Sequence, residues 1–73
     1  MEALKIQLTG SAAANYDIYY RTHVQNLGWL DWAKNGAASG SAGYAYHVES
    51  LQIIIMPKGS AAPGKTANAF QEK

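Results

Sequence analysis

An all-β fold is predicted for this chain of 73 residues. Apolar and polar residues alternate in the segments 2–8 and 16–25, which is the period of a half-buried strand. The segment 16–25 is also rich in tyrosine and β-branched residues, which suit a pleated surface. No segment of the sequence has the sustained 3.6-residue apolar spacing of an amphipathic helix. At this length we expect one small antiparallel sheet or sandwich.

The first predicted strand covers residues 2–8, where Leu4, Ile6 and Leu8 alternate with Lys5 and Gln7. Residues 9–15 are small and polar, so we expect a linker there.

The longest predicted strand runs from Tyr16 to Gln25. One face, expected to be buried, carries Tyr16, Ile18, Tyr20, Thr22 and Val24. The opposite and more polar face carries Asp17, Tyr19, Arg21, His23 and Gln25.

Gly28 interrupts this pattern and indicates a bulge or a tight turn. Residues 29–33 fit either a short strand or one helical turn, and Asn35-Gly36 is a strong turn signal. Residues 36–43 are glycine-, alanine- and serine-rich and are expected to form a loop, after which residues 44–56 return to strand composition. The end of that strand, residues 51–56, is almost continuously apolar, as expected where both faces are covered. Residues 58–73 are expected to be a flexible linker or tail.

Residues 2–8 are similar to residues 49–55, 47 positions later, and Gly-Ser-Ala-Ala at 10–13 recurs at 59–62. The predicted organisation is therefore the terminal strand of a preceding repeat (2–8), a linker (9–15), one repeat (16–57) and a flexible tail (58–73). A repeat unit normally needs a neighbour to bury its apolar face. Residues 2–8 could supply that strand within the chain, or several copies could form a homo-oligomer.

Composition excludes several functions. The formal net charge is +1 and the basic residues are scattered, so we expect no nucleic-acid partner. No apolar run approaches the roughly 20 residues of a membrane-spanning helix, and the N-terminal residues do not resemble a signal peptide. The chain has no cysteine and no cluster of metal-ligating residues, so neither a metal nor a cofactor is expected. The carboxylates are sparse and no nucleophile motif is present, so we expect no enzyme activity.

The candidate ligand-binding residues are aromatic and polar, a combination that suits a glycan because sugar C–H groups pack on rings while amides and carboxylates bind hydroxyls. These candidates are Trp32, Tyr19, Asp31, Asn35 and Gln25.

Four other residues are assigned structural roles. Trp29 is expected in the core, directly after the turn residue Gly28. His23 is expected to hydrogen-bond a loop carbonyl, and Glu49 to be a buried acceptor that holds the glycine-rich loop at residues 36–43.

The centre of the chain holds a specific constellation of residues: the stretch 20–29, which includes His-Val-Gln-Asn-Leu-Gly-Trp, then Trp32, Gly36, residues 40–43 and Glu49. This constellation resembles the ChW repeat, the clostridial hydrophobic repeat with a characteristic tryptophan. Ser41 stands where the family has threonine, Ser50 where it has alanine, and His47 where a basic residue is common. The resemblance covers about residues 16–56, and residues 2–8 look like the end of a preceding copy.

The resemblance implies a secreted or cell-surface module of Gram-positive bacteria that occurs in tandem copies. Three units of this length would suit a β-prism or a β-trefoil. Our leading hypothesis is a noncatalytic module that binds carbohydrate or a cell-wall component, as in adhesion. The alternative is a structural or protein-interaction repeat that self-associates or packs against neighbouring repeats.

Overall fold

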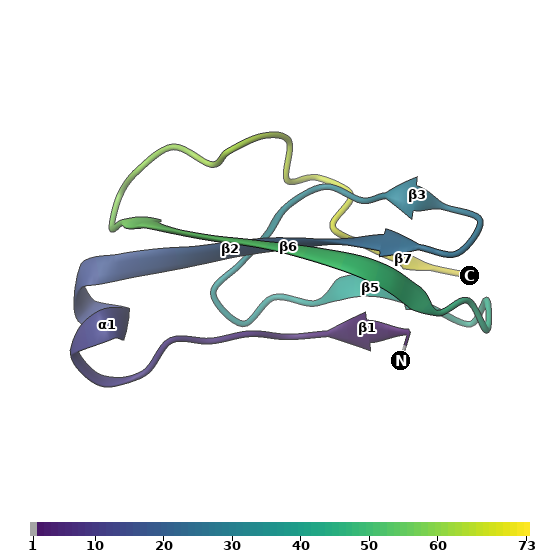
Figure 1. The fold of residues 1–73 in the computed structure, drawn as a ribbon, viewed down its shortest axis with the longest axis horizontal. Coiled ribbons are helices and arrows are strands. Elements are labelled where there is room, and N and C mark those ends of the chain that lie inside the picture. Colours follow the sequence, from purple (N-terminus) through teal and green to yellow (C-terminus); the bar gives the residue numbers. More distant parts are fainter. Residues whose placement is uncertain (1) are drawn as a thin grey trace.

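The computed structural model describes residues 2–73 and is built mainly from strands (Figure 1). In chain order the elements are β1 (Ala3–Leu4), α1 (Gly10–Asn15), β2 (Tyr16–Val24), β3 (Gly28–Trp29), β4 (Ala33–Lys34), β5 (Ser39–Ala42), β6 (Val48–Pro57) and β7 (Phe70–Glu72). The all-β prediction is confirmed. The arrangement of tandem copies stays a prediction.

The main sheet is organised around β2, the strand with the clearest sequence pattern. β6 pairs antiparallel with β2 along its whole length, from Tyr16 opposite Pro57 to Val24 opposite Val48. β3 and β4 share the other edge of β2. The Asn35-Gly36 turn predicted from the sequence follows β4, and both residues have the positive φ that a tight turn of this kind needs.

The second sheet has the order β1-β5-β7, with β1 antiparallel and β7 parallel to β5. Ile18, Tyr20 and Ala33 form the core cluster, against which Leu4, Ile6 and Leu8 pack. The alternation predicted for residues 2–8 is therefore confirmed: the apolar residues turn towards the core, while Lys5 and Gln7 are exposed.

The opposite face of β2 is covered at one end by the C-terminal segment. Residues 58–69 leave the end of β6 and arch back over the main sheet before β7 (Figure 1). The backbone N–H of Trp32 donates to the carbonyl of Lys65 at 2.9 Å, and the hydroxyl of Tyr19 donates to the carbonyl of Ser60 at 3.4 Å. Residues 58–73 were expected to be a flexible tail, but they cover a sheet face and contribute a strand. The linker at 9–15 also differs from expectation, since it contains the short helix α1.

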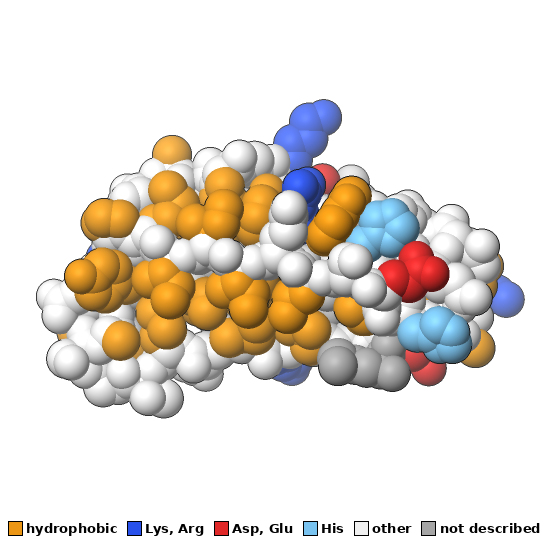
Figure 2. All heavy atoms as spheres, in the orientation of Figure 1, with side chains coloured by type: hydrophobic (Ala, Val, Ile, Leu, Met, Phe, Trp, Pro, Cys, Tyr) orange, Lys and Arg blue, Asp and Glu red, His pale blue; other side chains and the backbone are white. Residues whose placement is uncertain are grey.

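β6 departs furthest from the sequence prediction. Its apolar end was expected to be covered on both faces, yet most of the strand is exposed. Its outer edge has no strand partner among residues 2–73, because β2 lies on one side and no described strand lies on the other. Figure 2 shows hydrophobic side chains gathered along the middle of this surface.

Candidate functional site

The two aromatic residues predicted to bind ligand are buried. Trp32 is 8% exposed and Tyr19 is 3% exposed, because residues 58–69 cover both side chains. The sequence pattern placed Tyr19 on the polar face of β2, and that placement is correct, but this part of the face is largely covered. Both rings line an open groove of about 410 Å³ with Lys34 and Thr66, to which each presents only a small part of its surface.

The three polar candidates have structural partners. Asp31 Oδ2 accepts the backbone N–H of Asn68 at 3.0 Å, and Gln25 Oε1 accepts the backbone N–H of His47 at 3.4 Å. Asn35 Oδ1 accepts the backbone N–H of Ile18 at 2.9 Å. These side chains hold loops to the main sheet, and the structure does not gather the five predicted candidates at one exposed site.

Asn35 also contributes to a buried carboxylate site at the start of β2. Its Nδ2 donates to Asp17 Oδ1 at 2.9 Å, and the backbone N–H of Gly59 donates to Asp17 Oδ2 at 3.1 Å. Lys58 and Lys34 place their ammonium groups 3.3 and 3.6 Å from the same carboxylate. The hydrogen bonds from Asn35 and Gly59 hold the pKa of Asp17 well below its usual range, and the two lysines add to this. The site ties two turns to β2.

Trp29 was expected in the core, but the structure shows it at the surface with 42% exposure. Gly28 forms the predicted turn, with a φ of 80°. β3 then pairs for two residues with the end of β2, where Trp29 lies opposite His23. The indole is exposed because this end of the sheet face lies beyond the segment that covers Tyr19 and Trp32.

Arg21 lies between the two tryptophans. Its guanidinium carbon is 4.7 Å from the ring centroid of Trp29 and 4.9 Å from that of Trp32. Its Nε donates to Gln52 Oε1 at 2.6 Å, so the guanidinium is also held from β6. Cation–π contacts on both sides fix the orientation of the exposed indole relative to the buried one.

His23 and Glu49 form a pair beside the same indole. The imidazole meets Trp29 edge to face, with centroids 5.2 Å apart, and its Nδ1 is 3.1 Å from Glu49 Oε1. His23 was predicted to bond a loop carbonyl and Glu49 to be buried against the glycine-rich loop, and the structure shows neither arrangement. That loop contains β5, which is held instead by β1 and by the buried contact between Ser39 and Thr22.

These residues form an exposed surface that we call the Trp29 face. It consists of Arg21, His23, Trp29, Glu49 and Gln52. Figure 2 shows acidic and histidine side chains gathered at this end of the molecule. The face was not predicted from the sequence, because Trp29 and Glu49 were assigned to the interior and His23 to a hydrogen bond with a loop carbonyl. A usable signal was present, since Arg21 and His23 were already placed on the polar face of the strand.

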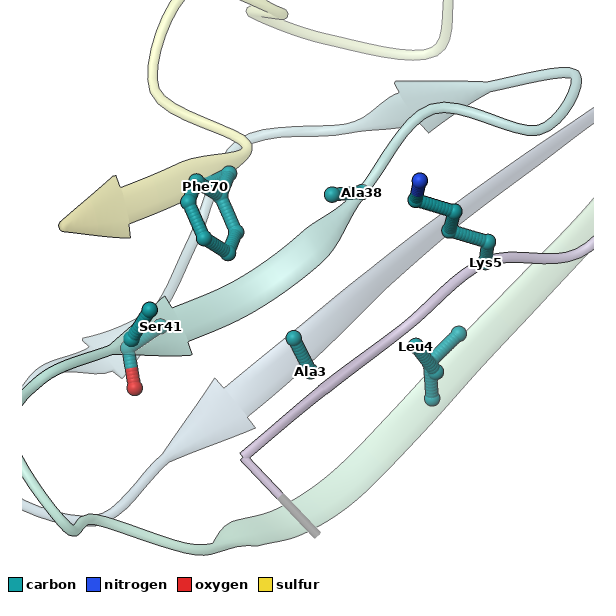
Figure 3. A pocket seen from close by; sticks show the side chains of 7 residues that line it. Ala3, Leu4, Lys5, Ala38, Ser41 and Phe70 are labelled. Carbon is teal, nitrogen blue, oxygen red and sulfur yellow. The ribbon is translucent and has the colours of Figure 1, made fainter.

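A second feature is an open groove of about 740 Å³ along the second sheet, between β1, β5 and β7 (Figure 3). Leu4, Lys5 and Phe70 line it together with small side chains. Ser41 also lines it, and its buried hydroxyl has no hydrogen-bond partner among the described residues. Residues 2–73 contain no group of three metal-ligating side chains and no helix long and apolar enough to cross a membrane.

Comparison with known families supports the resemblance inferred from the sequence. Residues 23–56 match the family model ChW, Clostridial hydrophobic W, a little under half of the chain. The matched segment includes His23, Trp29, Glu49 and Gln52 of the Trp29 face. Neither the curated proteins nor the solved structures gave a match to the chain. Residues 23–56 are therefore similar to the ChW repeat, whose family is typically extracellular in bacteria.

Proposed function

We propose that the ChW repeat at residues 23–56 is a noncatalytic binding module for carbohydrate or cell-wall material, and that the Trp29 face is its binding surface. The supporting observation is a tryptophan at the surface with hydrogen-bonding side chains arranged around it. On this proposal the module acts outside the cell or at its surface and needs neither metal nor cofactor.

The chemistry of the face suits a sugar ring. The C–H groups of a pyranose pack against an indole, while hydroxyl groups need both donors and acceptors at the edge of the ring. Arg21 offers donors, Glu49 offers acceptors, and the amide of Gln52 offers both. Arg21 and His23 already contact the indole, so little side-chain freedom is lost when a ligand binds.

Fluorescence titration of the full chain tests this proposal, with soluble peptidoglycan fragments and plant polysaccharides as ligands. We expect Trp29→Ala to weaken binding at least tenfold, with the remaining Trp32 as reporter. Tyr16→Ala is the matched control because Tyr16 is an equally exposed aromatic at the opposite end of β2. Absence of binding by the wild-type chain to every glycan, or full binding by Trp29→Ala, would overturn the proposal.

A second candidate function rests on a different observation, the exposed apolar strand β6. It favours a structural or protein-interaction repeat that self-associates or packs against neighbouring repeats. Glu49 and Gln52 of the Trp29 face belong to β6, but the side chains of Leu51, Ile53 and Ile55 point to the other face of the sheet from Gln52. The two functions are therefore compatible.

A further inference from the structure

The outer edge of β6 lacks the usual protection of an exposed edge strand. Natural edge strands are normally shortened, charged, bulged or covered, because their free backbone groups pair readily with other strands. β6 has ten residues, and none between Ser50 and Pro57 is charged. Leu51, Ile53 and Ile55 are 42%, 49% and 56% exposed. A strand of this composition is typical of a surface that another segment covers.

The free edge presents a defined set of backbone groups. On β2, the carbonyls of Thr22 and Ile18 accept hydrogen bonds from Leu30 and Asn35, on the side away from β6. Their partners across the β2–β6 ladder are Leu51 and Ile55. Residues opposite each other in an antiparallel ladder direct their backbone groups either towards each other or both away. The N–H and C=O groups of Leu51, Ile53 and Ile55 therefore point to the free edge.

Residues 2–8 show which strand a segment of this composition can pair with, because they lie along the edge of β5. The carbonyl of Glu2 accepts the N–H of Ser41, and the carbonyl of Ile6 accepts the N–H of Gly36, each at 2.8 Å. Leu4 lies opposite Ser39 in the ladder. The side chains of Leu4, Ile6 and Leu8 complete the core.

The internal repeat relates the two segments residue by residue. An offset of 47 takes Glu2 to Glu49, Leu4 to Leu51, Ile6 to Ile53 and Leu8 to Ile55. The apolar side chains that complete the core in the first segment thus correspond to those exposed in the second. The acceptor carbonyl of Ile6 likewise corresponds to the outward carbonyl of Ile53. Side-chain pattern and backbone direction therefore agree, and the backbone direction is independent of the sequence comparison that identified the repeat.

We propose that β6 docks on β5 of a second copy of this chain, in the place that residues 2–8 occupy in the first. Leu51 then lies opposite the second copy's Ser39, and Ser50 opposite its Gly40. The carbonyl of Ile53 accepts the N–H of the second copy's Gly36. Leu51, Ile53 and Ile55 enter that copy's core, and its own residues 2–8 are displaced.

We call the edge of β5 that residues 2–8 occupy the slot on β5. In this slot the two backbones approach each other closely. A Cβ atom on Gly40 would lie 2.3 Å from the carbonyl oxygen of Glu2 and 2.6 Å from Cα of Ala3. Figure 3 shows the segment with Ala3 and Leu4 running alongside β5. The exchange replaces one apolar strand by another with the same spacing, so β6 restores the core packing that the displaced residues 2–8 provided. We therefore expect association to rise steeply with chain concentration.

Disulfide trapping tests the exchange, since the chain has no cysteine of its own. Full chains carrying Leu51→Cys and Ser39→Cys are unfolded in urea, refolded together at high concentration and oxidised. We expect a crosslinked dimer. The double variant Leu4→Cys/Ser39→Cys is the positive control and should close within one chain. Gln52→Cys replaces Leu51→Cys in the register control, because successive side chains point to opposite faces. Crosslinking of Leu51→Cys no stronger than that of Gln52→Cys would overturn the proposal.

A second measurement needs no association. Four substitutions, Ala3→Ser, Lys5→Gln, Gln7→Ile and Leu8→Ile, give residues 2–8 the sequence of residues 49–55. If the segments are equivalent, this variant keeps cooperative unfolding with a Tm within about 5 °C of wild type, a shift worth about 1 kcal/mol in a chain of this size. Installing the sequence of residues 50–56 instead puts glutamine at the core-facing position 4 and apolar side chains at positions 3, 5 and 7, so this variant should be clearly less stable than the first. Equal stability of the two variants, or loss of folding by the first, would contradict the proposed equivalence.

This inference is independent of the proposed glycan binding. Trp29→Ala should leave the crosslink unchanged, since its side chain lies on the β3 side of the sheet. Ile53→Lys should abolish association but leave glycan binding intact. Failure of either proposal is thus visible without the other.

Discussion

The difference in burial between Trp32 and Trp29 predicts how much each tryptophan contributes to the free energy of unfolding. The structure buries Trp32 and exposes Trp29, the reverse of the roles predicted from the sequence. Trp32 is almost fully buried, and removing a buried tryptophan side chain costs about 3–5 kcal/mol. Trp29 buries roughly two-thirds as much of its surface, and water fills the space it leaves, so we expect Trp29→Ala to cost about 1–2 kcal/mol. A chain of this length has a total free energy of unfolding of about 4–11 kcal/mol. Trp32→Ala should therefore remove a large share of the stability, and Trp29→Ala a small one.

Urea denaturation measures the free energy of unfolding of both variants. Unfolding is followed by circular dichroism and not by fluorescence, because each substitution itself changes the tryptophan fluorescence. If Trp32→Ala does not fold, Trp32→Phe and Trp29→Phe give the same comparison with a smaller loss of stability. We expect the denaturation midpoint to fall much more for position 32 than for position 29. An equal or larger fall for position 29 would show that Trp29 is the core residue, and would refute the structural basis of the Trp29 face.

Two further predictions concern the carboxylate site and the slot on β5. The Asp17 pKa is lower in the folded chain than in the unfolded one, so the carboxylate stabilises the fold above about pH 4 and this contribution is lost as the pH falls further. The Tm difference between wild type and Asp17→Asn should therefore be largest near neutral pH and shrink in acid; a difference independent of pH would contradict this. Gly40→Ala should cost about 1–3 kcal/mol in urea denaturation, because the new Cβ meets the backbone of residues 2–8. Gly59→Ala is the control: its φ is also positive but no atom lies within 4 Å of the added Cβ, so an equal loss would argue against the close approach.

Local pattern predicted much of the fold. Alternation placed Leu4, Ile6 and Leu8 towards the core, and β2 was identified over almost its full length. The turn at Asn35-Gly36 was predicted because its backbone requirement is local to those residues. The central segment was also placed in the correct family.

The site was predicted less well, because exposure at a sheet face depends on what covers it. Tyr19 and Arg21 lie on the same face of β2, yet Tyr19 is buried and Arg21 is half-exposed. The difference arises from residues 58–69, which have few apolar side chains and no period, so the sequence offered no sign of where they pack. The role of Glu49 depended equally on which loop or strand lies near it.

The sequence by itself determined the strand periods and the turn, since each depends on neighbouring residues, and it predicts the 47-residue repeat from a comparison of the chain with itself. Only the tertiary structure decided which tryptophan is buried and that β6 keeps a free edge. Both depend on contacts between segments distant in sequence, and a segment's own residues carry little information about which distant segment will lie over them.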